Sequence, residues 1–324
     1  ALFLKREIEG GANMAKTTAR LPKVFTPFDV AMFEMGEATG KIGRVLEIVT
    51  EREEKSLELS RKVKQALIYP IAIAVIAVSM IAVIMTYVVP KIEGIYREAN
   101  ANLPALTMAV IGMSRFLRGY GIFLLVLLFI ASVIVPMVLR NPAVRLKFDE
   151  SVLRIPIFGS ILRKKILVSF CEFLGSLLSS GIVINRALTI VKAGVGNRYY
   201  EAEIEAMLQD VKTGKPLSSC MGGEYTERKI RGEKIPADEE TRYLRKIECF
   251  PIELSTAVKV GESTGTLAKM LDKASGRYNR EIDSLVKNLS SMLEPVVIVG
   301  VGGIVGTIVL AIMLPFFNMV NVIR

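Results

Sequence analysis

Long runs of apolar residues alternate with polar stretches along this chain of 324 residues. No charged residue occurs from Gln65 to Val89, from Gly119 to Leu139, or from Pro295 to Val320. About 20 helical residues cross the roughly 30 Å hydrocarbon core of a bilayer, so each run is long enough to span it. The pattern predicts three transmembrane helices, at residues 68–90, 119–139 and 295–320.

The polar stretches carry apolar residues at helical spacing, which predicts helical bundles. One such stripe stops at Ser179-Ser180-Gly181, where glycine suits the end of a helix. It is followed by a stripe in residues 184–191 and another in residues 201–211 that ends before Gly214. The predicted fold is therefore an all-α membrane protein. The first stripe consists of Phe170, Phe173, Leu174, Leu177 and Leu178.

One pattern of residues occurs twice, at an offset of 225 positions. A repeat of this kind indicates an internal duplication, here of a helical module followed by a membrane span. We expect two homologous modules, the first truncated at its N-terminus, because residues 8–14 resemble residues 211–217 at a different offset. The repeated positions include Gly36, Glu37, Thr39, Gly40, Pro70 and Pro90, which recur as Gly261, Glu262, Thr264, Gly265, Pro295 and Pro315.

These patterns divide the chain into two modules and their connections. The first module, 1–67, is followed by the span 68–90, a short external segment 91–118 and the span 119–139. The second module, 140–294, precedes the span 295–320 and an external end at 321–324. A charged insertion at about 222–246 distinguishes the second copy. We favour a solvated loop there over a partner-docking element, because balanced charge runs usually face water.

The distribution of basic residues orients the chain. Lys and Arg number 12 in residues 1–67 and 25 in residues 140–294, against 4 in residues 91–118 and 1 after the last span. Basic residues near span ends remain cytoplasmic, which places both modules and the N-terminus inside and the C-terminus outside. We interpret the net charge of +10 as a consequence of this topology, and we expect it to attract the chain to anionic lipid of the inner leaflet. Acidic residues interspersed among the basic ones argue against nucleic-acid binding.

The residue types exclude several kinds of chemistry. The chain has three cysteines and no histidine, so histidine-dependent triads and histidine-ligated metals are excluded. Cys171, Cys220 and Cys249 lie on the predicted cytoplasmic side and show no metal-binding spacing. A phosphate-binding loop of the GxxxxGK[ST] type is also missing from the sequence. We expect no enzyme activity, no cofactor and no metal site.

The repeated Gly-Glu-x-Thr-Gly is the sharpest local motif. We expect one glycine to end a helix, the other to allow close backbone approach, and the threonine to cap the following helix. The glutamate either interacts favourably with the positive end of a helix dipole at a helix N-terminus, or it presents a carboxylate to a partner or a cation.

The membrane segments supply the other candidate residues. Gly302 and Gly306 have the spacing that lets two helices approach closely, within the chain or between protomers. Glu294 is either an interfacial residue or one that makes a contact unique to the second copy. The predicted membrane boundaries are Pro70, Pro90, Glu294, Pro295 and Pro315.

Taken in order and spacing, these motifs resemble the type II secretion F and type IV pilus inner-membrane platform family over essentially the whole chain. The charged insertion and the missing start of the first module depart from that pattern. The residues that carry the resemblance are Leu153-Arg154-Ile155-Pro156, Leu177-Leu178-Ser179-Ser180-Gly181, Gly214-Lys215-Pro216, Phe250-Pro251, Glu294-Pro295 and both Gly-Glu-x-Thr-Gly motifs, with Phe25, Tyr69-Pro70, Pro90 and Leu103-Pro104 in the first copy.

The resemblance implies a non-enzymatic scaffold in the bacterial inner membrane. Its implied partners are a hexameric assembly ATPase, pilins or pseudopilins, other inner-membrane assembly proteins, membrane lipid and further copies of the chain. The alternative is a small-solute transporter or channel subunit, although its spans offer few polar residues. A membrane sensor is a third interpretation, but residues 91–118 form only a short external segment, in which 105–117 is expected to lie on the membrane surface as a helix.

Overall fold

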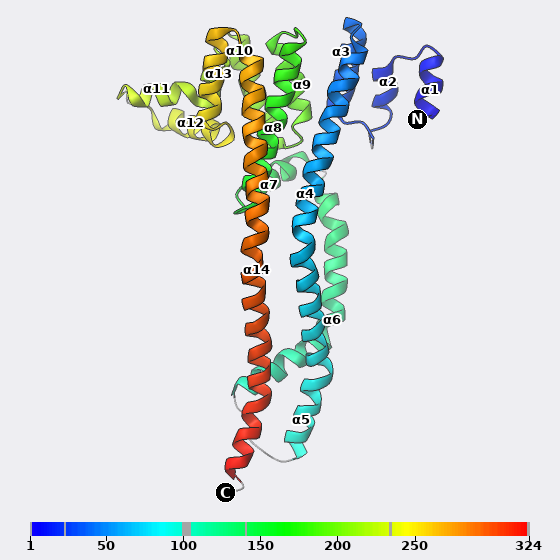
Figure 1. Cartoon of the computed structure of the whole chain (residues 1–324), viewed down its shortest axis with the longest axis vertical. Coiled ribbons are helices and arrows are strands. Elements are labelled where there is room, and N and C mark those ends of the chain that lie inside the picture. Colours follow the sequence, from blue (N-terminus) through cyan, green and yellow to red (C-terminus); the bar gives the residue numbers. More distant parts are fainter. Residues whose placement is uncertain (1, 23, 99–104, 140, 233–234, 323–324) are drawn as a thin grey trace. The chain divides into compact units, whose positions relative to one another are not determined.

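The computed structural model describes residues 2–22, 24–98, 105–139, 141–232 and 235–322. All regular secondary structure within these ranges is helical, which confirms the all-α prediction (Figure 1). The helices are α1 (Leu2–Glu9), α2 (Met14–Ala19), α3 (Pro27–Thr39), α4 (Ile42–Val83), the π-helix η1 (Ile84–Val88), α5 (Val89–Glu98), α6 (Ala105–Val138), α7 (Pro142–Leu153), α8 (Phe158–Ser179), α9 (Ile184–Gly194), α10 (Arg198–Lys212), the π-helix η2 (Ser219–Gly223), α11 (Glu224–Ile230), α12 (Ala237–Cys249), α13 (Ile252–Thr264) and α14 (Leu267–Val322).

The helices form two compact units. Unit 1 contains Ala1–Ser60 and Pro142–Leu285, and unit 2 contains Arg61–Asn141 and Val286–Arg324. Two long helices, α4 with 42 residues and α14 with 56, contribute residues to both units. Most of the two predicted modules therefore lies together in unit 1, whereas the predicted spans lie in unit 2.

The core of unit 1 is built from the helical stripes that the sequence predicts. Helix α8 ends at Ser179 and is followed by its C-cap Ser180 and by Gly181, whose φ of 83° lies in the left-handed region. The chain then turns into α9, which packs on α8, α10 and α3. Large side chains that are completely or almost completely buried in this core are Phe28, Phe33, Phe170, Leu174, Leu177, Leu188, Tyr200, Ile204, Met207, Leu217 and Phe250.

Side-chain caps fix the start of several helices of unit 1. Thr26 and Asp29 form a capping box at the start of α3, and Pro27 occupies its first turn. The amide oxygen of Asn197 accepts hydrogen bonds from the backbone N–H groups of Tyr199 at 3.1 Å and Tyr200 at 3.2 Å. These caps satisfy backbone donors that have no partner inside their own helix.

Most described residues of the charged insertion are helical, so the prediction of a loop was wrong, although many of these residues are exposed as expected. Helices α11 and α12 replace the loop, and α12 is tied to α10 by two ion pairs. The Lys246 ammonium lies 3.0 Å from a carboxylate oxygen of Asp210, and Arg245 pairs with Glu203. The balanced charges thus pair with each other and with the bundle, a tertiary arrangement that composition alone does not specify.

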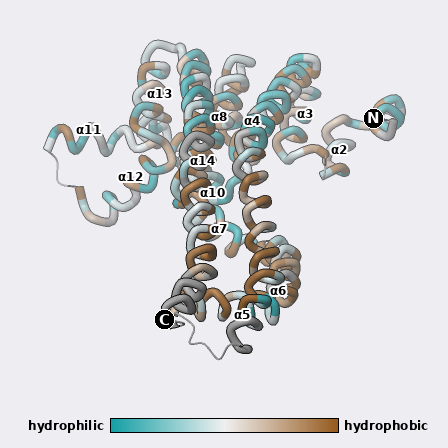
Figure 2. Tube along the Cα trace, turned by 60° about the horizontal axis from the view of Figure 1, so that its bottom comes forward, coloured by the Kyte–Doolittle hydropathy of each residue, from teal (hydrophilic) through white to brown (hydrophobic). Residues whose placement is uncertain are grey.

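In unit 2 the structure describes fewer complete spans than the sequence predicts. Residues Ile71–Gly94 form one stretch that is long and apolar enough to cross a membrane. A second candidate consists of Ala105–Phe123 and Val126–Val138, which meet at a bend of 46°. The apolar part of α14 within the described residues, Ile298–Ala311, is shorter than a span. Figure 2 shows the apolar residues gathered on α6 and on the second half of α4.

The N-terminal half of α6 is helical, as expected, and one of its faces is buried inside unit 2. Ser114 donates a hydrogen bond from its hydroxyl to the carbonyl of Met85 in η1 at 2.5 Å. Thr107 donates to the carbonyl of Ala311 in α14 at 2.7 Å. Ile111 lies between them on the same face and contributes to a small apolar core. This half of α6 therefore connects the first and the last apolar helices of unit 2.

Candidate functional site

The glutamates of the repeated motif each cap a helix that lies earlier in their own copy. The Glu262 carboxylate accepts hydrogen bonds from the backbone N–H of Leu217 at 2.6 Å, the N–H of Ser218 at 3.1 Å and the Ser218 hydroxyl at 2.7 Å. The Glu37 carboxylate accepts from the N–H of Met14 and, at 3.3 Å, from that of Ala15. A carboxylate is favourable here because the first N–H groups of a helix are unpaired and carry partial positive charge.

The two glycines of each motif have separate structural roles. Gly40 and Gly265 end α3 and α13 with φ values of 67° and 68°, the left-handed conformation that glycine adopts without strain. Gly36 and Gly261 lie one turn earlier and allow close approach of the next helix. A Cβ at Gly261 would lie only 2.7 Å from the Cα of Leu267. The motif therefore builds the same tight helix–turn–helix connection twice.

The threonines differ from the prediction. Thr39 donates its hydroxyl hydrogen bond to the carbonyl of Met35 at 2.8 Å, and Thr264 donates to that of Val260 at 2.8 Å. Each threonine thus bonds backward within its own helix, and the prediction that it caps the following helix was wrong. The reason is that the left-handed glycine comes after the threonine, which leaves threonine as the last residue of the preceding helix.

An aromatic and ionic cluster joins residues of the first copy to residues of the second copy within unit 1. The rings of Phe28 and Phe173 stack with centroids 4.0 Å apart. The guanidinium carbon of Arg52 lies 5.0 Å from one ring centroid and 5.1 Å from the other. Arg52 also pairs with the buried Asp29 at 2.7 Å. Gly194 is required beside this stack, since a Cβ there would lie 2.6 Å from the Phe28 ring.

A polar cleft of about 540 Å³ lies next to this cluster, between α4, α8 and the start of α14. Lys55 bridges it by pairing with Glu172 at 3.3 Å and Glu51 at 2.9 Å. Burial raises the pKa of Glu172, although Lys55 acts in the opposite direction. Burial lowers the pKa of Lys55, but its bonds to both glutamates outweigh burial and leave the pKa above its usual value. The charges lining the cleft are thus largely compensated.

Unit 2 contains a charged cluster that sequence analysis missed. The carboxylate of Glu93 in α5 is largely buried and pairs with Arg115 and, at 3.9 Å, with Arg118 of α6. The first acidic residue after a long apolar run was the available signal, and two arginines in the next helix supplied its partners. This ion pair and the Ser114 and Thr107 hydrogen bonds fix α6 to its neighbours.

The remaining predicted residues are placed as follows. Pro90 lies in the first turn of α5, and Pro295 lies exposed within α14. A Cβ at Gly302 or Gly306 would meet no atom within 4 Å, so the structure shows no close intramolecular packing there. The side chains of Pro70, Glu294 and Pro315 lie outside the described part of the chain, and both α4 and α14 continue through those positions.

The cysteines are structural in character. Cys171, Cys220 and Cys249 are buried and unpaired. Burial raises the pKa of the Cys220 thiol to about 11 and raises those of the other two further. A thiol with a raised pKa is a poor nucleophile and a poor metal ligand. Within the described residues, the structure contains no group of three or more acidic or cysteine side chains arranged to hold a metal.

Comparison with known proteins gives one consistent result. Residues 2–90 and 170–315 match the profile of the family described as "Type II secretion system (T2SS), protein F". The chain is 27% identical over 321 residues to the type IV pilus assembly protein PilC of Pseudomonas aeruginosa, covering 99% of this chain and 80% of that protein.

Two further relatives span both systems. The type IV pilus assembly protein PilC of Thermus thermophilus is 30% identical over 318 residues, which cover 98% of this chain and 73% of that protein. The type II secretion system protein F of Aeromonas hydrophila is 27% identical over 321 residues, with 99% and 77% covered. The two stretches matched by the family profile contain one Gly-Glu-x-Thr-Gly motif each.

Proposed function

We propose that this chain, which belongs to the type II secretion system protein F family, is the inner-membrane platform of a type IV pilus or type II secretion machine. Its role would be to couple a cytoplasmic assembly ATPase to the insertion or extraction of pilins or pseudopilins. Membership of the family carries the proposal, since relatives with both kinds of printed name match nearly the whole chain. It favours the platform over the transporter interpretation.

The proposed mechanism is mechanical and does not require chemistry within this chain. The sequence lacks a phosphate-binding loop, so work would arrive from a partner that hydrolyses nucleotide. Helices α4 and α14 each contribute residues to both units, which gives unit 1 two continuous helical connections to the apolar unit 2. A partner that binds one conformation of unit 1 more tightly than another would shift the equilibrium of the whole chain.

The topology completes the proposal. We infer three spans, with unit 1 cytoplasmic, the N-terminus inside and the C-terminus outside. The positive-inside distribution supports this orientation, and Ile71–Gly94 supplies one span by length and composition. We also propose a homo-oligomer, in which Gly302 and Gly306 of α14 approach another apolar helix, because no described atom of the same chain occupies the space beside them.

The test combines genetics with biochemistry. Deletion of the gene should abolish surface fibres or secretion, and the full chain should restore them. Purified protein in detergent or nanodiscs should crosslink through unit 1 to the assembly ATPase of the same organism. The matched control is a chain that carries the crosslinker at Arg115, in the predicted external segment. No crosslink to a cytoplasmic ATPase is expected from that position. Normal fibre output and secretion after deletion would exclude the platform role.

A further inference from the structure

The surface of unit 1 carries a group of exposed apolar residues in α7 and just after it, the part of unit 1 that follows α6 in the sequence. Two belong to one side of α7, two to the turn between α7 and α8, and Phe158 begins α8. We call this group the α7 patch. Phe158 is 50% exposed, Ile155 46% and Phe148 44%. Isolated exposed apolar residues are ordinary, but a local concentration indicates a surface that another phase or partner covers. The patch consists of Val144, Phe148, Ile155, Ile157 and Phe158.

The turn between α7 and α8, which presents Ile155 and Ile157 next to Phe158, is tightly constructed. Ile157 has a φ of 68°, a conformation that β-branched residues rarely adopt. Hydrogen bonds from the Phe158 N–H to the Pro156 carbonyl and from the Gly159 N–H to the Ile155 carbonyl, both 2.8 Å, hold it. A Cβ at Gly159 would lie 2.2 Å from the Leu153 carbonyl oxygen, so only glycine fits. These contacts therefore fix the backbone shape of this turn.

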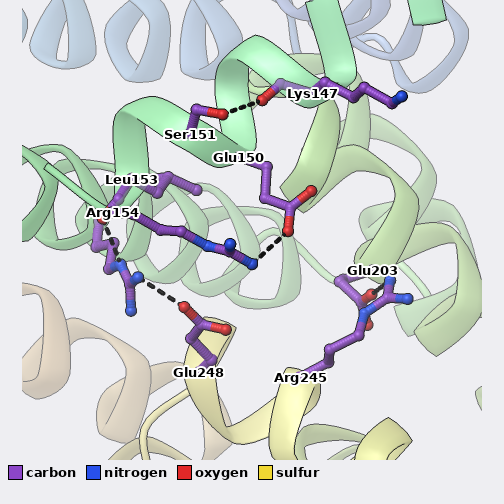
Figure 3. A network of polar contacts seen from close by, with 9 residues as sticks. Lys147, Glu150, Ser151, Leu153, Arg154, Glu203, Arg245 and Glu248 are labelled. Carbon is purple, nitrogen blue, oxygen red and sulfur yellow. Dashed lines mark hydrogen bonds and ion pairs between the residues drawn. The ribbon is translucent and has the colours of Figure 1, made fainter.

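Ion pairs anchor the base of this turn to the bundle (Figure 3). Arg163 donates hydrogen bonds to the Leu153 carbonyl at 3.2 Å and to Glu248 at 2.7 Å. Arg154 pairs with Glu150 at 2.7 Å. Arg163 of α8 thus holds the end of α7 at the Leu153 carbonyl, and Arg154 holds the start of the turn to α7 itself.

Two cations that form no ion pair with a described residue accompany the apolar residues. Arg145 and Lys147 are exposed on α7 and have no carboxylate partner among the described residues. Lys147 extends away from the ion pairs of the network in Figure 3. Asp149, four residues after Arg145, keeps its negative charge while it accepts a hydrogen bond from the Arg198 N–H at 2.8 Å, so it offsets part of this positive charge without forming an ion pair. Apolar side chains mixed with lysine and arginine are typical of elements that lie in the interface of an anionic bilayer.

The connection to α6 favours a bilayer over a soluble partner. Only residues 139–141 separate the apolar helix α6 from α7. At no more than about 3.6 Å per residue, this connection keeps the start of α7 close to the end of that helix. We infer that the α7 patch docks on the anionic phospholipid surface, with its apolar side chains in the headgroup region and Arg145 and Lys147 against lipid phosphates. This inference holds whether or not the chain serves a pilus or secretion machine.

Site-specific fluorescence in nanodiscs tests the docking directly. The full chain carries Ile155→Cys or Phe158→Cys, labelled with an environment-sensitive dye; its native thiols are buried and react slowly. Val183→Cys is the control, since Val183 is 73% exposed at the start of α9 and outside the patch. In discs containing phosphatidylglycerol, the dye at 155 or 158 should emit at shorter wavelength and be quenched by nitroxide lipids. The dye at 183 should show neither effect.

Charge variants test the lipid chemistry. Arg145→Gln and Lys147→Gln should each lower the ratio of docked to undocked patch about fivefold, the factor that corresponds to about 1 kcal/mol per cation. Arg186→Gln, a change of an exposed cation on α9, should leave the ratio unchanged. Equal emission and quenching at 158 and 183 would overturn the proposal. A shielded dye that nitroxide lipid does not quench would indicate a protein partner and overturn it too, as would equal docking in discs of phosphatidylcholine alone.

Discussion

Replacing Glu262 by glutamine tests whether the repeated motif acts by capping a helix. The change keeps the shape of the side chain but removes its charge and turns one acceptor oxygen into a donor. Glu262 accepts three hydrogen bonds, two of them from backbone N–H groups. A glutamine can accept from only one of those two N–H groups in the same geometry, and the other then faces an amide that also donates.

The expected magnitude follows from these contacts. An N–H group left without an acceptor in a partly buried site destabilises by about 1–3 kcal/mol. Loss of the carboxylate at a helix N-terminus adds about 0.3–1 kcal/mol. We therefore expect the start of the helix at Leu217 to open more easily by about 2–3 kcal/mol. Glu37→Gln should have a smaller effect, because Glu37 accepts two hydrogen bonds and one of them is 3.3 Å long.

Hydrogen exchange of the full chain in nanodiscs measures this opening locally. Since about 1.4 kcal/mol corresponds to a factor of ten, peptides covering residues 214–223 should exchange roughly thirty to a hundred times faster. The control is Glu253→Gln on the same helix, where the carboxylate is exposed and the effect should be a few tenths of a kcal/mol. Unchanged exchange at Leu217 and Ser218 in the Glu262→Gln protein would refute the capping role.

Three further changes test other contacts. Gly265→Ala should lower the free energy of unfolding by roughly 1–2 kcal/mol, because position 265 is left-handed but uncrowded. Gly261→Ala should lower it by several times as much, because its Cβ would collide with the next helix. Equal losses of stability in thermal unfolding would contradict the close-approach role of Gly261. Arg52→Lys should lower the free energy of unfolding, measured in urea, by about 1–3 kcal/mol, because lysine lacks the planar group that stacks on both rings. An unchanged free energy would show that the stack does not contribute to stability. Burial raises the pKa of Asp210, but two lysines outweigh it and leave the pKa below its usual value. The stabilisation by ionised Asp210 is therefore present above about pH 4 and is lost as the pH falls through the lower pKa of the folded state. After correction for intrinsic rates, hydrogen exchange in α12 should be slower at pH 6 than at pH 3. The Asp210→Asn variant should not show this difference.

Several elements of the fold were predictable because they depend on local sequence. The stripe from Phe170 to Leu178 and the glycine at 181 determine where α8 buries its face and where it ends. The resemblance between residues 8–14 and 211–217 also has a structural counterpart. Met14 and Leu217 are aligned when these two segments are superposed. The backbone N–H of each donates a hydrogen bond to the glutamate of the repeated motif in its own copy. Periodicity and backbone-determining residues act over a few turns, so they can be read in one dimension.

Contacts between distant segments could not be predicted in this way. Nothing near Phe28 indicates that it stacks on Phe173, and nothing near Glu93 indicates which arginines pair with it. The charged insertion shows the same limit, since its composition suited a loop, whereas in the structure α12 is a helix paired with α10.

The sequence alone determined the helical character of this protein, its apolar runs, its repeated Gly-Glu-x-Thr-Gly motif and the absence of histidine and of a phosphate-binding loop from the given residues. Only the tertiary structure decided that residues of the two copies share one unit, that each repeated glutamate reaches back to an earlier helix, and that the α7 patch remains uncovered. The physical reason is that helix formation and apolar runs reflect neighbouring residues, whereas capping across the chain, ion pairing and exposure depend on which surfaces meet when the chain folds.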